Sequence, residues 1–94
     1  MEIASFQQTV RDTYYDRDAE RGVDGTFRWF TEEVGEIAGA LRGKGDLVHE
    51  FGDVLAWLAS LASLVGVSLE EAAARYANGC PRCGSKPCAC TFVR

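Results

Sequence analysis

Residues 54 to 67, VLAWLASLASLVGV, carry no charge over fourteen positions. A helix needs roughly 18 to 20 apolar residues to cross a bilayer, so this stretch is predicted to be a buried helix and not a membrane span. Its apolar side chains occupy nearly the whole circumference, and a chain of 94 residues has little else to cover them. We expect a homodimer or a dimer of dimers that packs through this helix. The alternative is a monomer whose first and fourth helical segments cover it.

Glycine-rich turns divide the chain into four helical segments, and no strand-like alternation of useful length is present. The first segment is predicted to begin at Ser5, with Gln8 as its capping-box partner, and to end near Gly22. The chain is therefore predicted to be all-α, a four-helix bundle.

The other three segments have start and stop signals of their own. The second is predicted to start near Thr26, after a turn at residues 24–25, and to end at Gly43. The third and fourth are predicted to begin at the N-cap residues Asp46 and Ser68.

The formal net charge of −4 argues against stable binding of nucleic acid, which needs a basic face. The charge is uneven along the chain. Residues 1 to 71 carry six Lys or Arg and fourteen Asp or Glu, giving −8, whereas residues 72 to 94 carry four basic residues and no acid, giving +4. The N-terminus lacks the features of a signal peptide, so we expect a cytoplasmic protein.

Four acids are predicted to share one side of a helical hairpin. At about 100° per residue, Glu33 and Glu36 lie along the flank of the core stripe of the second segment. Glu50 and Asp53 repeat the i, i+3 spacing on the third segment. The core stripe of the second segment is predicted to be Phe30, Val34, Ile37 and Leu41. Two antiparallel helices would then present four carboxylates to one point.

None of these four acids has Lys or Arg three or four residues away, whereas Glu32 has Arg28 at i−4. Converging carboxylates repel unless protons or cations neutralise them, and oxygen ligands favour Mg²⁺ or Mn²⁺. The alternative is a set of solvated helix acids. His49 lies about 100° from Glu50 on the helix and is not predicted to be a ligand.

The order EExxE, thirteen residues, then ExxD resembles the signature of MazG-like all-alpha nucleoside triphosphate pyrophosphohydrolases, and the similarity runs from about residue 6 to 78. The resemblance implies a Mg²⁺-dependent enzyme that hydrolyses an NTP or dNTP to the monophosphate and pyrophosphate, often in nucleotide-pool house-cleaning. It makes Glu32 the residue that positions or deprotonates the attacking water. The metal ligands that it implies are Glu33, Glu36, Glu50 and Asp53.

Four further residues are candidates for substrate binding. The resemblance implies that Arg75 and Asn78 on the last helix contact the nucleotide, although Arg75 also suits a local ion pair with Glu71. Trp29 could stack on a base, but core packing is the alternative reading. Lys44 in the GKG loop could reach a phosphate or simply be solvated.

The cysteines Cys80, Cys83, Cys88 and Cys90 fall within the eleven residues CPRCGSKPCAC. Four thiolates match a closed structural Zn²⁺ site, with disulfide or redox chemistry and free thiols as alternatives. We therefore expect a MazG-like helical domain at residues 1–78 and a Cys-rich tail at residues 79–94.

Two other functions stay open. A non-catalytic, zinc-containing helical dimer could serve as an interaction module. The same metal site could also act on another pyrophosphate, such as a nucleotide sugar or a modified dNTP, because the sequence does not identify the base or the sugar.

Overall fold

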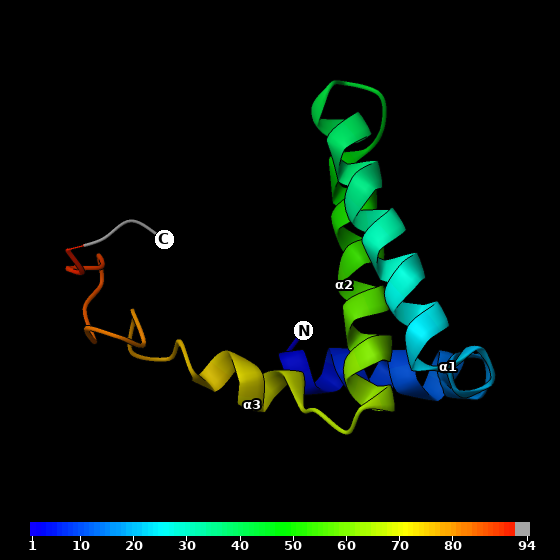
Figure 1. The fold of residues 1–94 in the computed structure, drawn as a ribbon, viewed down its shortest axis with the longest axis horizontal. Helices are drawn as coiled ribbons and strands as arrows, with labels where there is room; N and C mark the ends of the chain where they lie inside the picture. The colour runs from blue at the N-terminus through cyan, green and yellow to red at the C-terminus, as the bar shows by residue number, and fades with distance from the viewer. Residues whose placement is uncertain (92–94) are drawn as a thin grey trace.

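A computed structural model describes residues 1–91 of the chain, and all of its helices lie between residues 3 and 74 (Figure 1). The three helices are α1 (Ile3–Leu41), α2 (Leu47–Leu64) and α3 (Leu69–Ala74), and the described residues contain no strand. The all-α prediction is confirmed. The predicted count of four separate helices differs, because the first two predicted segments are joined within α1.

Helix α1 bends at Gly22, which has φ 85° and ψ 171°, a conformation that only glycine adopts readily. Gly22 therefore divides α1 into an N-terminal arm and a second arm. Figure 1 shows the N-terminal arm lying across the end of a hairpin that the second arm forms with α2. The predicted break near Gly22 is confirmed, but the predicted turn at residues 24–25 is wrong, because those residues continue the helix.

Two of the three predicted N-caps are confirmed. The side chain of Asp46 accepts a hydrogen bond from the His49 amide at the start of α2, and Ser68 does the same for Glu71 at the start of α3, each at 3.2 Å. The predicted cap at Ser5 is wrong. Helix α1 begins earlier, because the Phe6 amide already donates to the Glu2 carbonyl at 2.9 Å.

The hairpin turns through residues 43–45, as predicted, with Gly43 at φ 82°. The last carbonyls of α1 are satisfied within this turn, since Arg42 and Lys44 both donate to the Gly39 carbonyl. The turn makes the second arm of α1 and α2 antiparallel neighbours (Figure 1). This hairpin is the scaffold on which the acids lie.

The core of the single chain is small. Its buried apolar residues are Val10, Ala40, Ala59 and Ala62. The predicted core stripe is only partly covered, since Val34 and Leu41 are 45% and 68% exposed. By length and composition alone α2 could cross a membrane, a test that the core helix of a water-soluble protein also passes, yet only 17% of it is buried. The single chain therefore leaves much apolar surface uncovered.

The third helix joins the fold through one side chain of α1. The Gln7 amide nitrogen donates to Ser63 Oγ at 3.2 Å and to the Val67 carbonyl at 2.9 Å, while its oxygen accepts from the Leu69 amide at 2.8 Å. Beyond this junction, α3 and the tail extend away from the hairpin (Figure 1). Helix α3 therefore packs mainly on α1 and does not cover α2.

Candidate metal centre

The hairpin brings acids from both helices to one side. Glu33 and Glu36 are one turn apart on the second arm of α1, and Glu50 and Asp53 are one turn apart on α2. Glu33, Glu50 and Asp53 are partly buried, whereas Glu36 is exposed. All four acids lie on the hairpin, but the donor atoms of Glu33 and Glu36 lie outside the close group that His49, Glu50 and Asp53 form.

The pKa of Glu33 is shifted by burial and by the neighbouring acids. Burial raises the pKa of Glu33 above its ordinary value of 4.5, and the carboxylates of Asp53, Glu50, Glu36 and Glu32 raise it further, in that order. The two largest of these charges come from α2, across the hairpin. Repulsion between the helices therefore concentrates at Glu33, which is where a cation would be stabilised most.

No lysine or arginine in the described part of the chain forms an ion pair with the four acids. The ion pairs present there are Arg21–Asp18 and Arg28–Asp24, and His49 contacts Asp53. Arg28 lies 3.3 Å from Asp24, so its predicted pairing with Glu32 is wrong. Glu32 is exposed and has no cationic partner among residues 1–91.

His49 belongs to the acidic cluster, although the sequence interpretation set it aside. Its Nε2 lies 3.2 Å from Asp53 Oδ2. Donor atoms of His49, Glu50 and Asp53 all lie within 4.8 Å of one another. The angle between His49 and Glu50 does not reveal this position, whereas the i, i+4 spacing of His49 and Asp53 places both on one face.

Trp29 stacks on Trp57 from the opposite helix, with ring centroids 5.8 Å apart and planes inclined by 13°. The Arg21 guanidinium carbon lies 4.7 Å from the centroid of the Trp57 ring. Trp29 nevertheless keeps 46% of its surface exposed. Trp29 therefore packs across the hairpin, as the core alternative predicts, and still has an accessible part that could stack on a base.

A cavity of about 270 Å³ adjoins Asp53 between the N-terminal arm of α1 and α2. Sequence reasoning did not find it, because the bend at Gly22 decides which face of the arm meets α2. Two arginines bring positive charge next to the acids, and Arg21 is held by Asp18 at 2.8 Å. The cavity is lined by Tyr14, Arg17, Asp18, Arg21, Asp53, Ala56, Trp57 and Ser60.

The other predicted substrate residues make no ion pair with the acids among residues 1–91. Lys44 is exposed in the hairpin turn. Arg75 caps α3 and Asn78 follows it, both exposed, on the segment that extends away from the hairpin (Figure 1). Arg75 lies over the Tyr76 ring at 5.9 Å and makes no ion pair with Glu71 in the described part of the chain.

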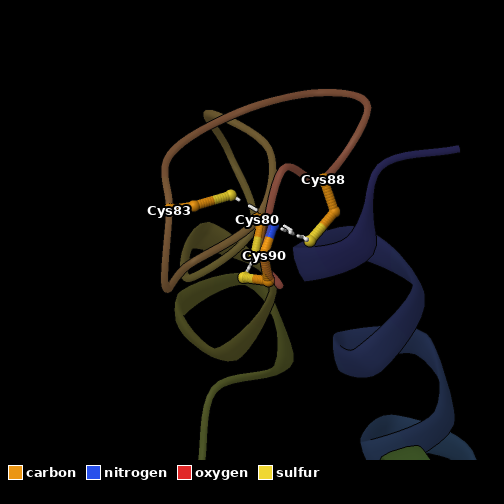
Figure 2. Close-up of side chains that lie close together, drawn as sticks. All are labelled: Cys80, Cys83, Cys88 and Cys90. Atoms are coloured by element: carbon orange, nitrogen blue, oxygen red, sulfur yellow. Dashed lines mark hydrogen bonds between the residues drawn. The ribbon is translucent and has the colours of Figure 1, made fainter. Parts of the chain in front are cut away.

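The four cysteines lie together at a second place in the tail (Figure 2). All four are free thiols, and their four sulfur atoms lie within 4.8 Å of one another. Hydrogen bonds from the backbone of Ala89 and Ser85 lower the pKa of Cys83 to about 6. Sharing of hydrogen bonds with Cys88 raises the pKa of Cys90 to about 12.

A model of the MazG nucleotide pyrophosphohydrolase domain matches residues 21–82. The chain belongs to this family. The MazG match contains all five acids and covers about two thirds of the sequence, so the resemblance seen in the acid pattern is confirmed. Among the curated proteins compared with the chain, none matches it. The MazG match ends at Arg82, so three of the four cysteines lie beyond it.

Proposed function

We propose that this MazG-family protein is a Mg²⁺-dependent nucleoside triphosphate pyrophosphohydrolase of the cytoplasm, acting in nucleotide-pool house-cleaning. The reaction joins water to the α-phosphorus of an NTP or dNTP and breaks the bond to the bridging oxygen of the β-phosphate. It yields the monophosphate and pyrophosphate. The observation that carries the proposal is that acids from both helices of the hairpin lie near enough to Glu33 to raise its pKa, with no lysine or arginine paired to them in residues 1–91.

The donor set fits a hard divalent cation. We assign Mg²⁺ or Mn²⁺ to Glu33, Glu36, Glu50 and Asp53, because carboxylate oxygens are the ligands that these ions prefer. A cation held there would supply Lewis-acid chemistry at the phosphates. His49 would orient Asp53 through their 3.2 Å contact.

Glu32 is assigned to the attacking water. Its carboxylate is exposed and lacks the Arg28 partner that the sequence suggested, so it is free to accept a proton or a hydrogen bond. It also lies close enough to Glu33 to raise the pKa of Glu33. A water between these neighbouring acids and the α-phosphorus would be oriented by Glu32.

The cavity beside Asp53 is the proposed site for the nucleotide within the chain. Arg17 supplies a cation for a phosphate, and Tyr14 and Trp57 supply aromatic faces for a base. The exposed part of Trp29 and the loop residue Lys44 are proposed to contact the substrate from the hairpin side. These residues surround the acids with groups suited to a nucleotide.

A homodimer or a dimer of dimers is proposed as the working state. Large apolar side chains stay exposed on α1 and α2, where an obligate interface would bury them. On the hairpin they include Phe27, Val34, Leu41, Leu47, Val48, Phe51 and Leu55. Because α3 extends away from its own hairpin, Arg75 and Asn78 are proposed to serve the acids of a neighbouring copy (Figure 1).

The division into a helical domain at residues 1–78 and a tail at residues 79–94 is kept as part of the proposal. A non-catalytic interaction module is the second candidate, supported by the exposed apolar surface of the hairpin. A modified dNTP or a nucleotide sugar could replace the ordinary triphosphate, because the cavity residues are suited to phosphate and aromatic groups in general.

The test is a panel of NTPs and dNTPs with Mg²⁺ or Mn²⁺, with the products separated by chromatography. We expect monophosphate and pyrophosphate in equal amounts, and a loss of about 10²-fold or more in Glu50→Gln. The matched control is Glu71→Gln, which neutralises an exposed acid on α3 and should leave turnover unchanged. Orthophosphate as the first product, or full turnover in Glu50→Gln, would overturn the mechanism. Inactivity across the panel would favour the interaction module.

A further inference from the structure

The four cysteine sulfurs lie close enough together to surround one metal ion. Cys80 Sγ and Cys90 Sγ are 3.7 Å apart, and Cys83 Sγ and Cys88 Sγ are 4.0 Å apart. In a tetrahedron with Zn–S bonds of about 2.3 Å, any two sulfurs are about 3.8 Å apart. These two distances are close to that value, and all four sulfurs lie within 4.8 Å of one another (Figure 2).

These distances exclude disulfides in this arrangement. A disulfide needs its two sulfurs at about 2.05 Å, far closer than either pair. All four thiols are free. The two pairs are nested along the chain, since the first cysteine approaches the fourth and the second approaches the third, and all four sulfurs form one compact group.

The backbone is shaped to hold the first two cysteines. The Gly84 amide donates to the Cys80 carbonyl at 2.7 Å, and the Cys80 amide donates to the Ser85 carbonyl at 3.0 Å. Gly84 has φ 73°, which a residue with a side chain rarely adopts. At Gly79, with φ 105°, an added Cβ would lie 2.8 Å from the Ser85 oxygen. Both glycines are therefore required by this tight turn.

Backbone amides also point at the sulfurs. The Ala89 amide donates to Cys83 Sγ at 3.3 Å, and the Cys90 amide donates to Cys88 Sγ at 3.4 Å. Donors directed at sulfur favour thiolates, which are the form that binds metal. Each of these two cysteines thus receives a bond that fixes its orientation.

The surroundings suit a negatively charged metal cluster. Four thiolates around one divalent ion carry a net charge of −2. The adjoining cavity of about 710 Å³ is shared by three of the cysteines and by Arg75, Arg82 and Lys86, and no acid lines it. The sequence from residue 72 onward contains no Asp or Glu at all. The positive charge of the tail would therefore stabilise the negative charge of the metal–thiolate cluster.

The tail has little else to hold its shape. Residues 75–91 contain no helix or strand, and most of them are exposed. No large apolar side chain in this segment is buried. In segments of this kind a metal ion takes the place of a hydrophobic core.

We infer that Cys80, Cys83, Cys88 and Cys90 bind one structural Zn²⁺ ion, which fixes residues 79–91 beside the end of α3. Four protein ligands close the coordination shell, so no position is open for substrate, and the site is structural and not catalytic. Three of its ligands lie outside the residues that match the MazG family. The site is therefore an addition of this chain to the family's helical part.

The test begins with the unmodified full-length chain, purified with a reducing agent and without metal-affinity resin. Elemental analysis should give one zinc per chain. Blocking the thiols should release that zinc in step with the modification of four cysteines. Replacement by Co²⁺ should give the strong visible absorption of a tetrahedral tetrathiolate site. These measurements need no variant, so they stand even where a variant fails to fold.

Cys83→Ser is the matching variant, with Ala89→Ser as its control. Both place a serine in the same loop, but only the first removes a ligand, and the second keeps the backbone amide that donates to sulfur. We expect zinc content to fall at least tenfold in Cys83→Ser and to stay at one per chain in Ala89→Ser. Zinc-free or iron-containing unmodified protein, or disulfides found in it by mass spectrometry, would overturn the inference.

Discussion

The acidic cluster and the cysteine cluster present metal ligands in opposite ways. The acids lie on two long helices, and among residues 1–91 His49, Glu50 and Asp53 bring donor atoms within 4.8 Å of one another, with Glu33 and Glu36 outside that group. The cysteines lie on a short loop, and all four meet the same limit. Helices hold side chains at fixed spacing and leave room for a substrate, whereas a loop can close completely around an ion. The carboxylate site leaves coordination positions open for a substrate, whereas the four cysteines can fill the whole coordination shell of an ion.

Chelation should produce the largest difference between the two clusters. A brief treatment with EDTA followed by gel filtration should abolish nucleotide hydrolysis, because an open carboxylate site exchanges its ion quickly. The tetrathiolate site should keep its zinc under the same treatment. Mg²⁺ alone should then restore activity. Activity that returns only after zinc is added would break the comparison, as measured by pyrophosphate release and elemental analysis.

Substitution of His49 should weaken the open site without destroying it. His49→Ala removes the contact at 3.2 Å to Asp53 and leaves all four carboxylates in place. We expect the apparent affinity for Mg²⁺ to fall about tenfold with kcat at saturating Mg²⁺ nearly unchanged. Steady-state kinetics across a Mg²⁺ titration measures both. A large loss of kcat at saturating Mg²⁺ would show that His49 has a direct part in the reaction.

Gln7 holds the junction between α2 and α3, on the path of the chain from the acids to the cysteines. Gln7→Ala removes three hydrogen bonds at the junction of α2 and α3, and we expect a loss of about 1–3 kcal/mol of unfolding free energy. The matched control is Gln8→Ala, which loses only an exposed bond to Asp12. Denaturant unfolding of both variants gives the difference. Equal stability of the two would mean that the junction is not held by this side chain.

The smallest effect concerns the stability of the metal-free protein. The folded state raises the pKa of Glu33, so folded protein binds this proton more tightly than unfolded protein does. The stability from this group is complete below the ordinary value of 4.5 and is lost as the pH rises through the folded pKa. Glu33→Gln should therefore raise the neutral-pH Tm of metal-free protein by on the order of 1–3 °C. Saturating Mg²⁺ should reverse the difference, as thermal unfolding at several pH values would record. The idea fails if the variant is less stable without metal.

Much of the fold could be predicted from local signals. Gly22, the hairpin turn and the caps at Asp46 and Ser68 depend on backbone chemistry within a few residues. The prediction of a cap at Ser5 is wrong because the helix already begins after Glu2, whose backbone carbonyl accepts the first hydrogen bond without help from a capping side chain. The exposure of Val34 and Leu41 could not be predicted from the periodicity, because a stripe shows which side is apolar but not what covers it.

The sequence indicated the acids of the candidate site, but the ion pair and the cavity that surround them were missed in the prediction. The pairing of Arg28 with Asp24 was available from the sequence, since an acid four residues before a base is the favoured order on a helix. The cavity with Arg17 and Arg21 was not available, because it exists only where the bend at Gly22 turns the N-terminal arm toward α2. The cavity could not be predicted because it depends on how segments far apart in the sequence pack together, and not on the chemistry of its residues.

The central claim is that the acids of both helices form one cation site, and Mn²⁺ binding to the metal-free chain tests it most directly. Titration followed by electron paramagnetic resonance should compare the unmodified chain with Glu33→Gln on α1, Glu50→Gln on α2, and the control Glu71→Gln. The account predicts that each of the first two variants binds Mn²⁺ at least tenfold more weakly and that the control binds normally. If Glu33→Gln binds Mn²⁺ as tightly as the unmodified chain, the site belongs to α2 alone and the account is contradicted.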